Sequence, residues 1–223
     1  MQQPILEIGE IVITHNGVDY WFKPTLKNIY KIGNPSEIVE IYGIVNLQNI
    51  LDYAEAIKDK SPFHQAYFLS VLRSPVFGRR ILLEAMNVVQ ACCDMDCTDL
   101  IGNFTPTAKG VRYKSGALSP KVIIAIARRL LEHGVIGCCK LDLNQEGENK
   151  SNNDDYSPEF NVIEYISLAR TMFGISREEA ESLTMTELQE MIKSKIPKKQ
   201  APKAVFSESE YDELMRAYEE RKG

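Results

Sequence analysis

The sequence has few of the residues on which catalytic sites depend. Its 223 residues include only three histidines, His15, His64 and His133, and these fall in unrelated segments. No serine, cysteine or carboxylate accompanies them at a spacing that would pair a nucleophile with a general base. We therefore expect a protein that is not an enzyme and that uses no cofactor.

The sequence also lacks a long apolar run and an excess of positive charge. No stretch approaches the roughly 20 apolar residues of a membrane helix, and the start MQQPILEIGE has neither the positive charge nor the apolar segment of a signal peptide. The 26 lysines and arginines are outnumbered by 31 aspartates and glutamates. These absences predict a cytoplasmic protein that binds neither membranes nor nucleic acid.

Cysteines are few and odd in number, which argues against a framework of disulfides. The five include two adjacent pairs, Cys92 with Cys93 and Cys138 with Cys139. We interpret them as reduced thiols buried like small apolar side chains, and we expect no metal. The alternative is a zinc site that joins Cys93 and Cys97 to Cys138 or Cys139, although this spacing matches no established ligand pattern.

The sequence does contain enough apolar residues for a helical core, since 44% of its residues are hydrophobic. Segment 119–133, SPKVIIAIARRLLEH, carries apolar residues on most of its circumference. Ser119 is a suitable N-cap, Pro120 suits the first turn, and Gly134 is predicted to end the helix in the left-handed conformation. We expect the rest of the first domain to fold around this helix.

Residues 5–24 predict a β-hairpin, because apolar residues alternate on both sides of Asn16-Gly17, a strong turn signal. The fold class is therefore mainly α with an N-terminal hairpin (α+β). Residues 36–60 have helical spacing, with a division at Gly43 or Asn46. A further helix is predicted to begin at Ser61-Pro62. Its inward-facing residues are expected to be Phe63, Ala66, Tyr67, Leu69 and Val71.

Composition divides the chain into four parts. Residues 1–143 form the hairpin and helical core, in which the basic segment 103–119 is expected to be an exposed contact loop with a short irregular hairpin. Residues 144–158, NQEGENKSNNDDYSP, predict a flexible linker. Residues 159–196 predict a small three-helix unit with capping boxes at Ser176 and Thr184. Residues 197–223 predict a basic spacer and a charged tail helix.

Two stretches of the chain carry a resemblance to a known family. THNGVDYWFKPTLKNIY joins a hairpin to a proline and a short helix, and FNVIEYISLARTMFGISREEAESLTMTELQEMIKSK contains the steps G-φ-S-x-E-E (174–179) and L-T-x-x-E-L (183–188). They resemble the tail assembly chaperones of long-tailed bacteriophages, in the long form that has a C-terminal extension.

The resemblance implies a viral late protein of the host cytoplasm, which binds the helical tape-measure protein and recruits tail-tube subunits. We expect residues 122–131, with Arg79 and Arg80, to face the tape measure and residues 160–191 to face the tube subunit. The candidate partner-binding residues are Arg79, Arg80, Arg112, Arg128, Arg129, Phe160, Phe173, Leu188 and Met191. Two alternatives remain open, a structural component of a virion or other assembly and a regulatory protein-binding module. Each is compatible with a homo-oligomer.

Overall fold

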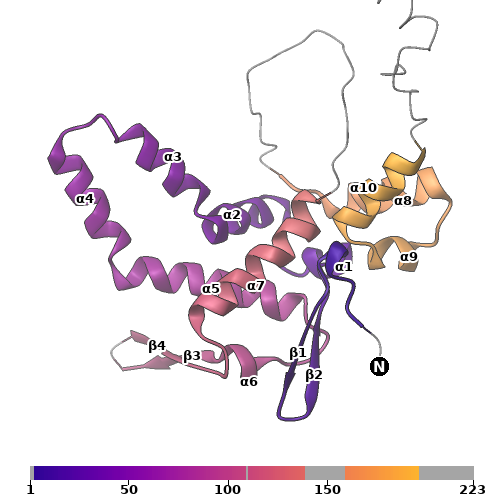
Figure 1. Ribbon diagram of the computed structural model, residues 1–223, viewed down its shortest axis with the longest axis horizontal. Coiled ribbons are helices and arrows are strands. Elements are labelled where there is room, and N and C mark those ends of the chain that lie inside the picture. The colour runs from indigo at the N-terminus through magenta and orange to yellow at the C-terminus, as the bar shows by residue number, and fades with distance from the viewer. Residues whose placement is uncertain (1–2, 109, 139–158, 196–223) are drawn as a thin grey trace, which may run out of the picture. The chain divides into compact units, whose positions relative to one another are not determined.

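The computed structural model of the chain describes residues 3–108, 110–138 and 159–195, and it is mainly helical as predicted (Figure 1). The chain forms two compact units, residues 1–190 and 191–223, and only 191–195 are described in the second. The predicted linker 144–158 and the tail 197–223 lie outside the described residues. The division of the chain at that linker therefore stays a prediction.

Two antiparallel hairpins contain the described strands. Strands β1 (Ile11–His15) and β2 (Val18–Phe22) pair around Asn16 and Gly17, whose φ angles of 50° and 79° suit a tight two-residue turn. This confirms the predicted N-terminal hairpin. Strands β3 (Asn103–Thr107) and β4 (Gly110–Lys114) form a second hairpin in the segment predicted as an exposed loop.

The helices occupy most of the remaining described residues. The predicted division within 36–60 falls at Leu47, next to Asn46, where φ is 62°. The helices before residue 139 are η1 (Leu6–Ile8), α1 (Leu26–Tyr30), α2 (Pro35–Asn46), α3 (Gln48–Ala56), α4 (Pro62–Leu72), α5 (Pro75–Ala91), α6 (Thr98–Ile101), α7 (Pro120–Leu131) and the π-helix η2 (Glu132–Ile136). Those after it are α8 (Val162–Phe173), α9 (Arg177–Ser182) and α10 (Met185–Lys195).

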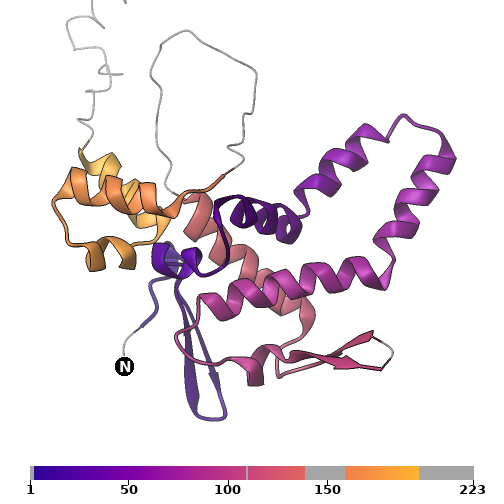
Figure 2. The ribbon, with the colours of Figure 1, turned by 180° about the vertical axis from the view of Figure 1, so that it is seen from behind.

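The core lies where α5 and α7 run side by side, and α2 packs against both (Figures 1 and 2). The apolar faces of α5 and α7 are removed from water, which is the main favourable contribution to such packing. Arg128 of α7 adds a polar tie, because its Nε donates to the carbonyl oxygen of Val45 in α2 at 2.9 Å. The buried residues of the two central helices are Ile81, Leu82, Ala85, Met86, Val88, Val89, Ile123, Ile126, Ala127, Leu130 and Leu131.

The end of the central helix differs from the prediction. Ser119 and Pro120 occupy the expected N-terminal positions, but the helix does not end at Gly134, which has no positive φ. It continues as η2 and ends at Gly137, which has a positive φ of 80° with an extended ψ of 147°. Gly134 has a packing role instead: a Cβ there would lie 2.5 Å from Ile29 Cδ1 of α1. Its missing side chain lets α1 and η2 approach closely.

Helices α8 and α9 pack against α1 within the first unit. The backbone N–H of Leu26 donates to the carbonyl oxygen of Leu183 at 2.8 Å, and that of Phe160 donates to the carbonyl oxygen of Pro35 at 3.0 Å. Reciprocal hydrogen bonds confirm the predicted capping boxes at Ser176 and Thr184. The C-terminal segment is thus bonded directly to the start of the helical core.

The predicted burial of α4 is wrong. This helix contains no buried residue, and Phe63, Ala66, Tyr67, Leu69 and Val71 are all exposed. Figures 1 and 2 show α3 and α4 as a helical hairpin apart from the α5 and α7 pair. The local sequence supplies an apolar helix, but its described neighbours bury none of its residues.

Replacing Gly134 with alanine should lower the free energy of unfolding by about 1 to 3 kcal/mol, because the new Cβ would overlap Ile29. Gly78, within α5, is the matched control: a Cβ there meets nothing within 4 Å. Gly78→Ala should stabilise the helix by about 0.5 to 1 kcal/mol. Urea denaturation followed by circular dichroism measures both changes. Equal stability of the two variants would contradict the close approach.

Candidate functional site

The most unusual surface of the described residues is the exposed side of α4. We define the α4 face as the exposed residues Phe63, Tyr67, Leu69 and Val71. Phe63, Tyr67 and Val71 are spaced by four residues and so form one stripe along the helix. Phe63 and Tyr67 are 78% and 63% exposed, which leaves two whole aromatic side chains in water. Exposed apolar clusters of this kind mark sites of protein interaction.

The sequence of α4 is apolar on all sides of the helix. PFHQAYFLSVL contains no charged residue, and a helix of this composition is normally buried. Inside the hairpin, the rings of Tyr53 in α3 and Phe68 in α4 are in contact, with centroids 5.2 Å apart. That contact covers only one side of α4. The other sides of α4 are as apolar as a protein core, but no described residue of this helix is buried.

Basic residues outnumber acidic ones in the segments that flank α4. Lys58 and Lys60 precede the helix with Asp59 between them, Arg73, Arg79 and Arg80 follow it, and no aspartate or glutamate occurs between residues 60 and 80. Arg73 and Arg79 are exposed and make no ion pair with a described residue. Val76, in the first turn of α5, is also exposed. This surface therefore combines apolar side chains with a positive charge, and it suits an acidic, amphipathic partner.

The predicted arginines fall into two groups. Three of them are engaged within the chain: Arg80 pairs with Glu40 at 2.6 Å, Arg128 bonds the Val45 carbonyl, and Arg129 Nη2 donates to the Leu6 carbonyl at 3.1 Å. Arg79 and Arg112 are exposed, on α5 and β4. The structure does not gather the five arginines into one surface, since they lie on three different elements.

The predicted apolar contacts of the C-terminal helices are mostly internal. Phe160 is 6% exposed and Leu188 is fully buried, so both side chains pack inside the chain. Phe173 and Met191 are half-buried. The large apolar side chains that α8 presents to solvent are instead Ile163 and Leu168. Phe160 precedes α8 and Leu188 lies in α10, whereas Ile163 and Leu168 lie in α8, and periodicity within one helix does not show which face a distant element covers.

Three of the cysteines are confirmed as core residues. Cys92, Cys93 and Cys97 are buried, and the Cys97 thiol donates to Gln90 Oε1 at 3.2 Å. Burial raises the pKa of Cys92 to about 12, so this thiol stays protonated at neutral pH. Cys138 differs, because it is exposed. Cys139 lies outside the described residues.

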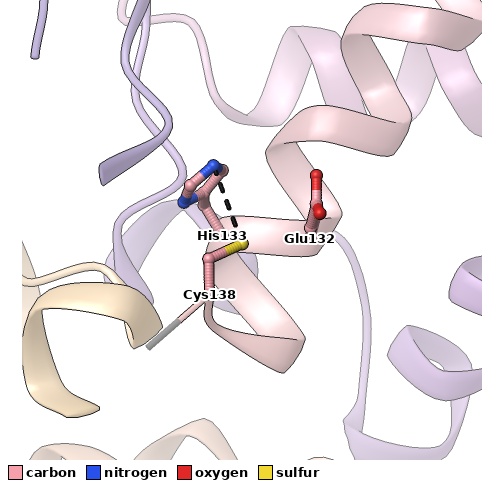
Figure 3. Close-up of side chains that lie close together, drawn as sticks. All are labelled: Glu132, His133 and Cys138. Carbon is pink, nitrogen blue, oxygen red and sulfur yellow. Dashed lines mark hydrogen bonds between the residues drawn. The ribbon is translucent and has the colours of Figure 1, made fainter. Parts of the chain in front are cut away.

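A second cluster forms at the end of the central helix, where Glu132, His133 and Cys138 converge (Figure 3). Their donor atoms lie within 4.8 Å of one another, and Cys138 Sγ is 3.8 Å from His133 Nε2. This corrects the expectation that no histidine has a cysteine or carboxylate partner. The signal that could have revealed it is the spacing Glu-His-x4-Cys, in which one turn of helix and a glycine bend bring the ends together.

Thr186, in the first turn of α10, holds the histidine of this cluster. Thr186 Oγ1 is 2.9 Å from His133 Nδ1, accepts from the Cys138 backbone N–H at 3.1 Å and donates to the His133 carbonyl at 3.5 Å. Burial, with a smaller effect of the Arg129 guanidinium, lowers the pKa of His133. The ring is therefore neutral at pH 7. Thr186 Oγ1 lies beside its Nδ1, and Cys138 Sγ lies beside its Nε2.

The comparisons with known proteins identify one family. The profile of a family described as "Family of unknown function (DUF6246)" matches residues 22–213. No curated protein and no solved structure matches the chain. Among the described residues, no helix is both long enough and apolar enough to cross a bilayer.

Replacing Thr186 with valine should lower the free energy of unfolding by about 1 to 3 kcal/mol, because it leaves a buried imidazole and the Cys138 N–H without their partner. The control is Thr171→Val, since the exposed Thr171 hydroxyl bonds only the Ser167 carbonyl of its own helix. That change should stay within about 0.5 kcal/mol. Chemical denaturation compares the two, and equal effects would contradict the role of Thr186.

Proposed function

This chain belongs to the family of unknown function DUF6246, and we propose that it is a tail assembly chaperone of a long-tailed bacteriophage. It is a non-enzymatic protein of the infected cell's cytoplasm that holds the tape-measure protein and recruits tail-tube subunits. The resemblance of residues 14–30 and 160–195 to that class supports the proposal. The structural observation that carries it is the exposed α4 face.

The α4 face is suited to hold a helical partner. An amphipathic helix buries its apolar side when it lies against an apolar surface, with anchors spaced by three or four residues. Phe63, Tyr67 and Val71 offer such a row. The lysines and arginines on either side of α4 favour a partner helix with acidic residues along its edges. A tape-measure protein is a long helical chain that can repeat this contact.

The tape-measure side is thus placed on α4 and the start of α5, and Arg79 is the predicted residue that adjoins it. The central segment 122–131 contributes its apolar side chains to the core instead, apart from the exposed Val122. For the tube subunit, we assign the exposed Ile163 and Leu168 of α8 in place of the buried Phe160 and Leu188. The two partners then meet different surfaces of the chain.

The rival proposal is a structural component that assembles with itself through the same apolar surface. An exposed apolar helix also favours self-association, so the α4 face by itself supports either role. The discriminating observation is the partner that covers it. A chaperone is recovered with the tape-measure protein and is absent from finished particles, whereas a structural component remains in them.

The double variant Phe63→Ala, Tyr67→Ala should weaken binding to the tape-measure protein by about thirtyfold or more, because buried aromatic anchors contribute about 2 kcal/mol or more when truncated. Co-purification from cells that express both proteins detects the complex, and titration of acidic tape-measure peptides measures its affinity. Tyr30→Ala is the matched control, since Tyr30 is 56% exposed but lies on α1. It should bind as the unchanged protein does.

The outcomes separate the two proposals. Loss of the tape-measure complex in the α4 variant, with tube-subunit capture kept, supports the chaperone. Ile163→Glu should show the reverse pattern. The chaperone proposal is wrong if the unchanged protein co-purifies only with copies of itself and the α4 variant forms a smaller oligomer, as measured by light scattering. The structural role then replaces it.

A further inference from the structure

The cluster Glu132, His133 and Cys138 brings together three kinds of metal-ligating atom. A carboxylate oxygen, an imidazole nitrogen and a thiol sulfur lie within 4.8 Å of one another, and Figure 3 shows the Cys138 sulfur beside the His133 ring with the Glu132 carboxylate to one side of this pair. In a tetrahedral zinc site the ligand atoms are roughly 3.3 to 3.7 Å apart. The sulfur and the imidazole nitrogen, at 3.8 Å, are already close to this separation.

The histidine is oriented as a metal-bound histidine would be. His133 Nδ1 lies 2.9 Å from Thr186 Oγ1, which leaves Nε2, 3.8 Å from Cys138 Sγ, to face the cluster. Metal-ligating histidines almost always donate their other ring N–H to a fixed oxygen, which sets the tautomer and the ring angle. Thr186 provides that oxygen here.

The backbone bend that returns Cys138 to His133 is specific to glycine. Gly137 has φ of 80°, and a Cβ there would lie 2.2 Å from Gln189 Oε1. The N–H of Gly137 donates to the Glu132 carbonyl at 2.7 Å, and Gln189 Nε2 donates to the Ile136 carbonyl at 2.7 Å. The turn between the ligands is therefore held by the backbone and by α10.

We propose that Glu132, His133 and Cys138 bind a zinc ion, with water in the fourth position. The mixed set of thiolate, imidazole and carboxylate suits zinc, whereas magnesium and calcium prefer oxygen ligands alone. His133 is buried, and its Nε2 lies 3.8 Å from Cys138 Sγ. The exposed Glu132 side chain moves inward by a rotamer change, while Arg129, 3.6 Å from Glu132 Oε2, is its present ionic partner.

Zinc binding releases one proton. The Cys138 thiol loses its proton to solvent and bonds the metal as a thiolate. The bound ion would link η2 to Cys138, whose backbone N–H donates to Thr186 Oγ1. Zinc should therefore raise the melting temperature of the chain.

The test is a cobalt titration of the full-length chain after treatment with a chelator. Tetrahedral cobalt with a thiolate ligand gives a near-ultraviolet charge-transfer band and strong visible bands, and we expect both to saturate at one equivalent and to disappear on addition of zinc. Cys138→Ser, at an exposed position, should remove the charge-transfer band and lower zinc affinity about a hundredfold or more. It should also abolish the zinc-dependent rise in melting temperature.

Three controls isolate the proposed ligands. Cys139→Ser and His64→Gln should keep the full cobalt spectrum, while Glu132→Gln should weaken binding without loss of the thiolate band. Circular dichroism checks that each variant is folded. A saturable spectrum that survives Cys138→Ser, one that is lost in Cys139→Ser, or no saturable spectrum at all would each overturn the proposal.

Discussion

The packing of α7 against α5 is the contact on which the other described elements depend. Each helix contributes a row of aliphatic side chains to one shared core, and small residues such as Ala85 and Ala127 let the two backbones lie close. Arg128 of α7 reaches the carbonyl at Val45 and so fixes α2 beside the pair. The helix then continues through Gly134, where the absence of a side chain admits α1.

That extension of α7 also forms the cluster of Glu132, His133 and Cys138. Because the helix does not end at Gly134, residues Glu132 and His133 are carried to the point where α10 begins, and Gly137 bends Cys138 back toward them. Thr186 and Gln189 bond the resulting turn. The close approach of α1 and η2 at Gly134 thus lies in the same helical extension that brings Glu132 and His133 to Cys138.

The exposed α4 face shows where local pattern and global packing separate. The apolar residues of Pro62–Leu72 have the composition of a buried helix, and the sequence accordingly indicated an inward stripe. The Tyr53 ring of α3 and helix α5 lie against this helix, and they bury none of its residues. An apolar helix without a cover is stable in water only at a cost in hydration free energy, and a bound partner would remove that cost. The proposed chaperone role is one resolution of this conflict.

Sequence alone determined the features that arise within a few residues of one another. Asn16-Gly17 specifies a hairpin because those residues tolerate positive φ, and Ser176 with Glu179 specifies a helix start because their side chains satisfy free backbone groups. Only the tertiary structure decided which side of an apolar helix is covered by other elements. It also decided that Gly134 is a packing contact with α1 and not the end of a helix, and that the side chain of Cys138 lies beside His133. The burial of a side chain, and the meeting of side chains from different elements, depend on segments far apart in the sequence. A local sequence pattern does not encode how close those segments come in the fold.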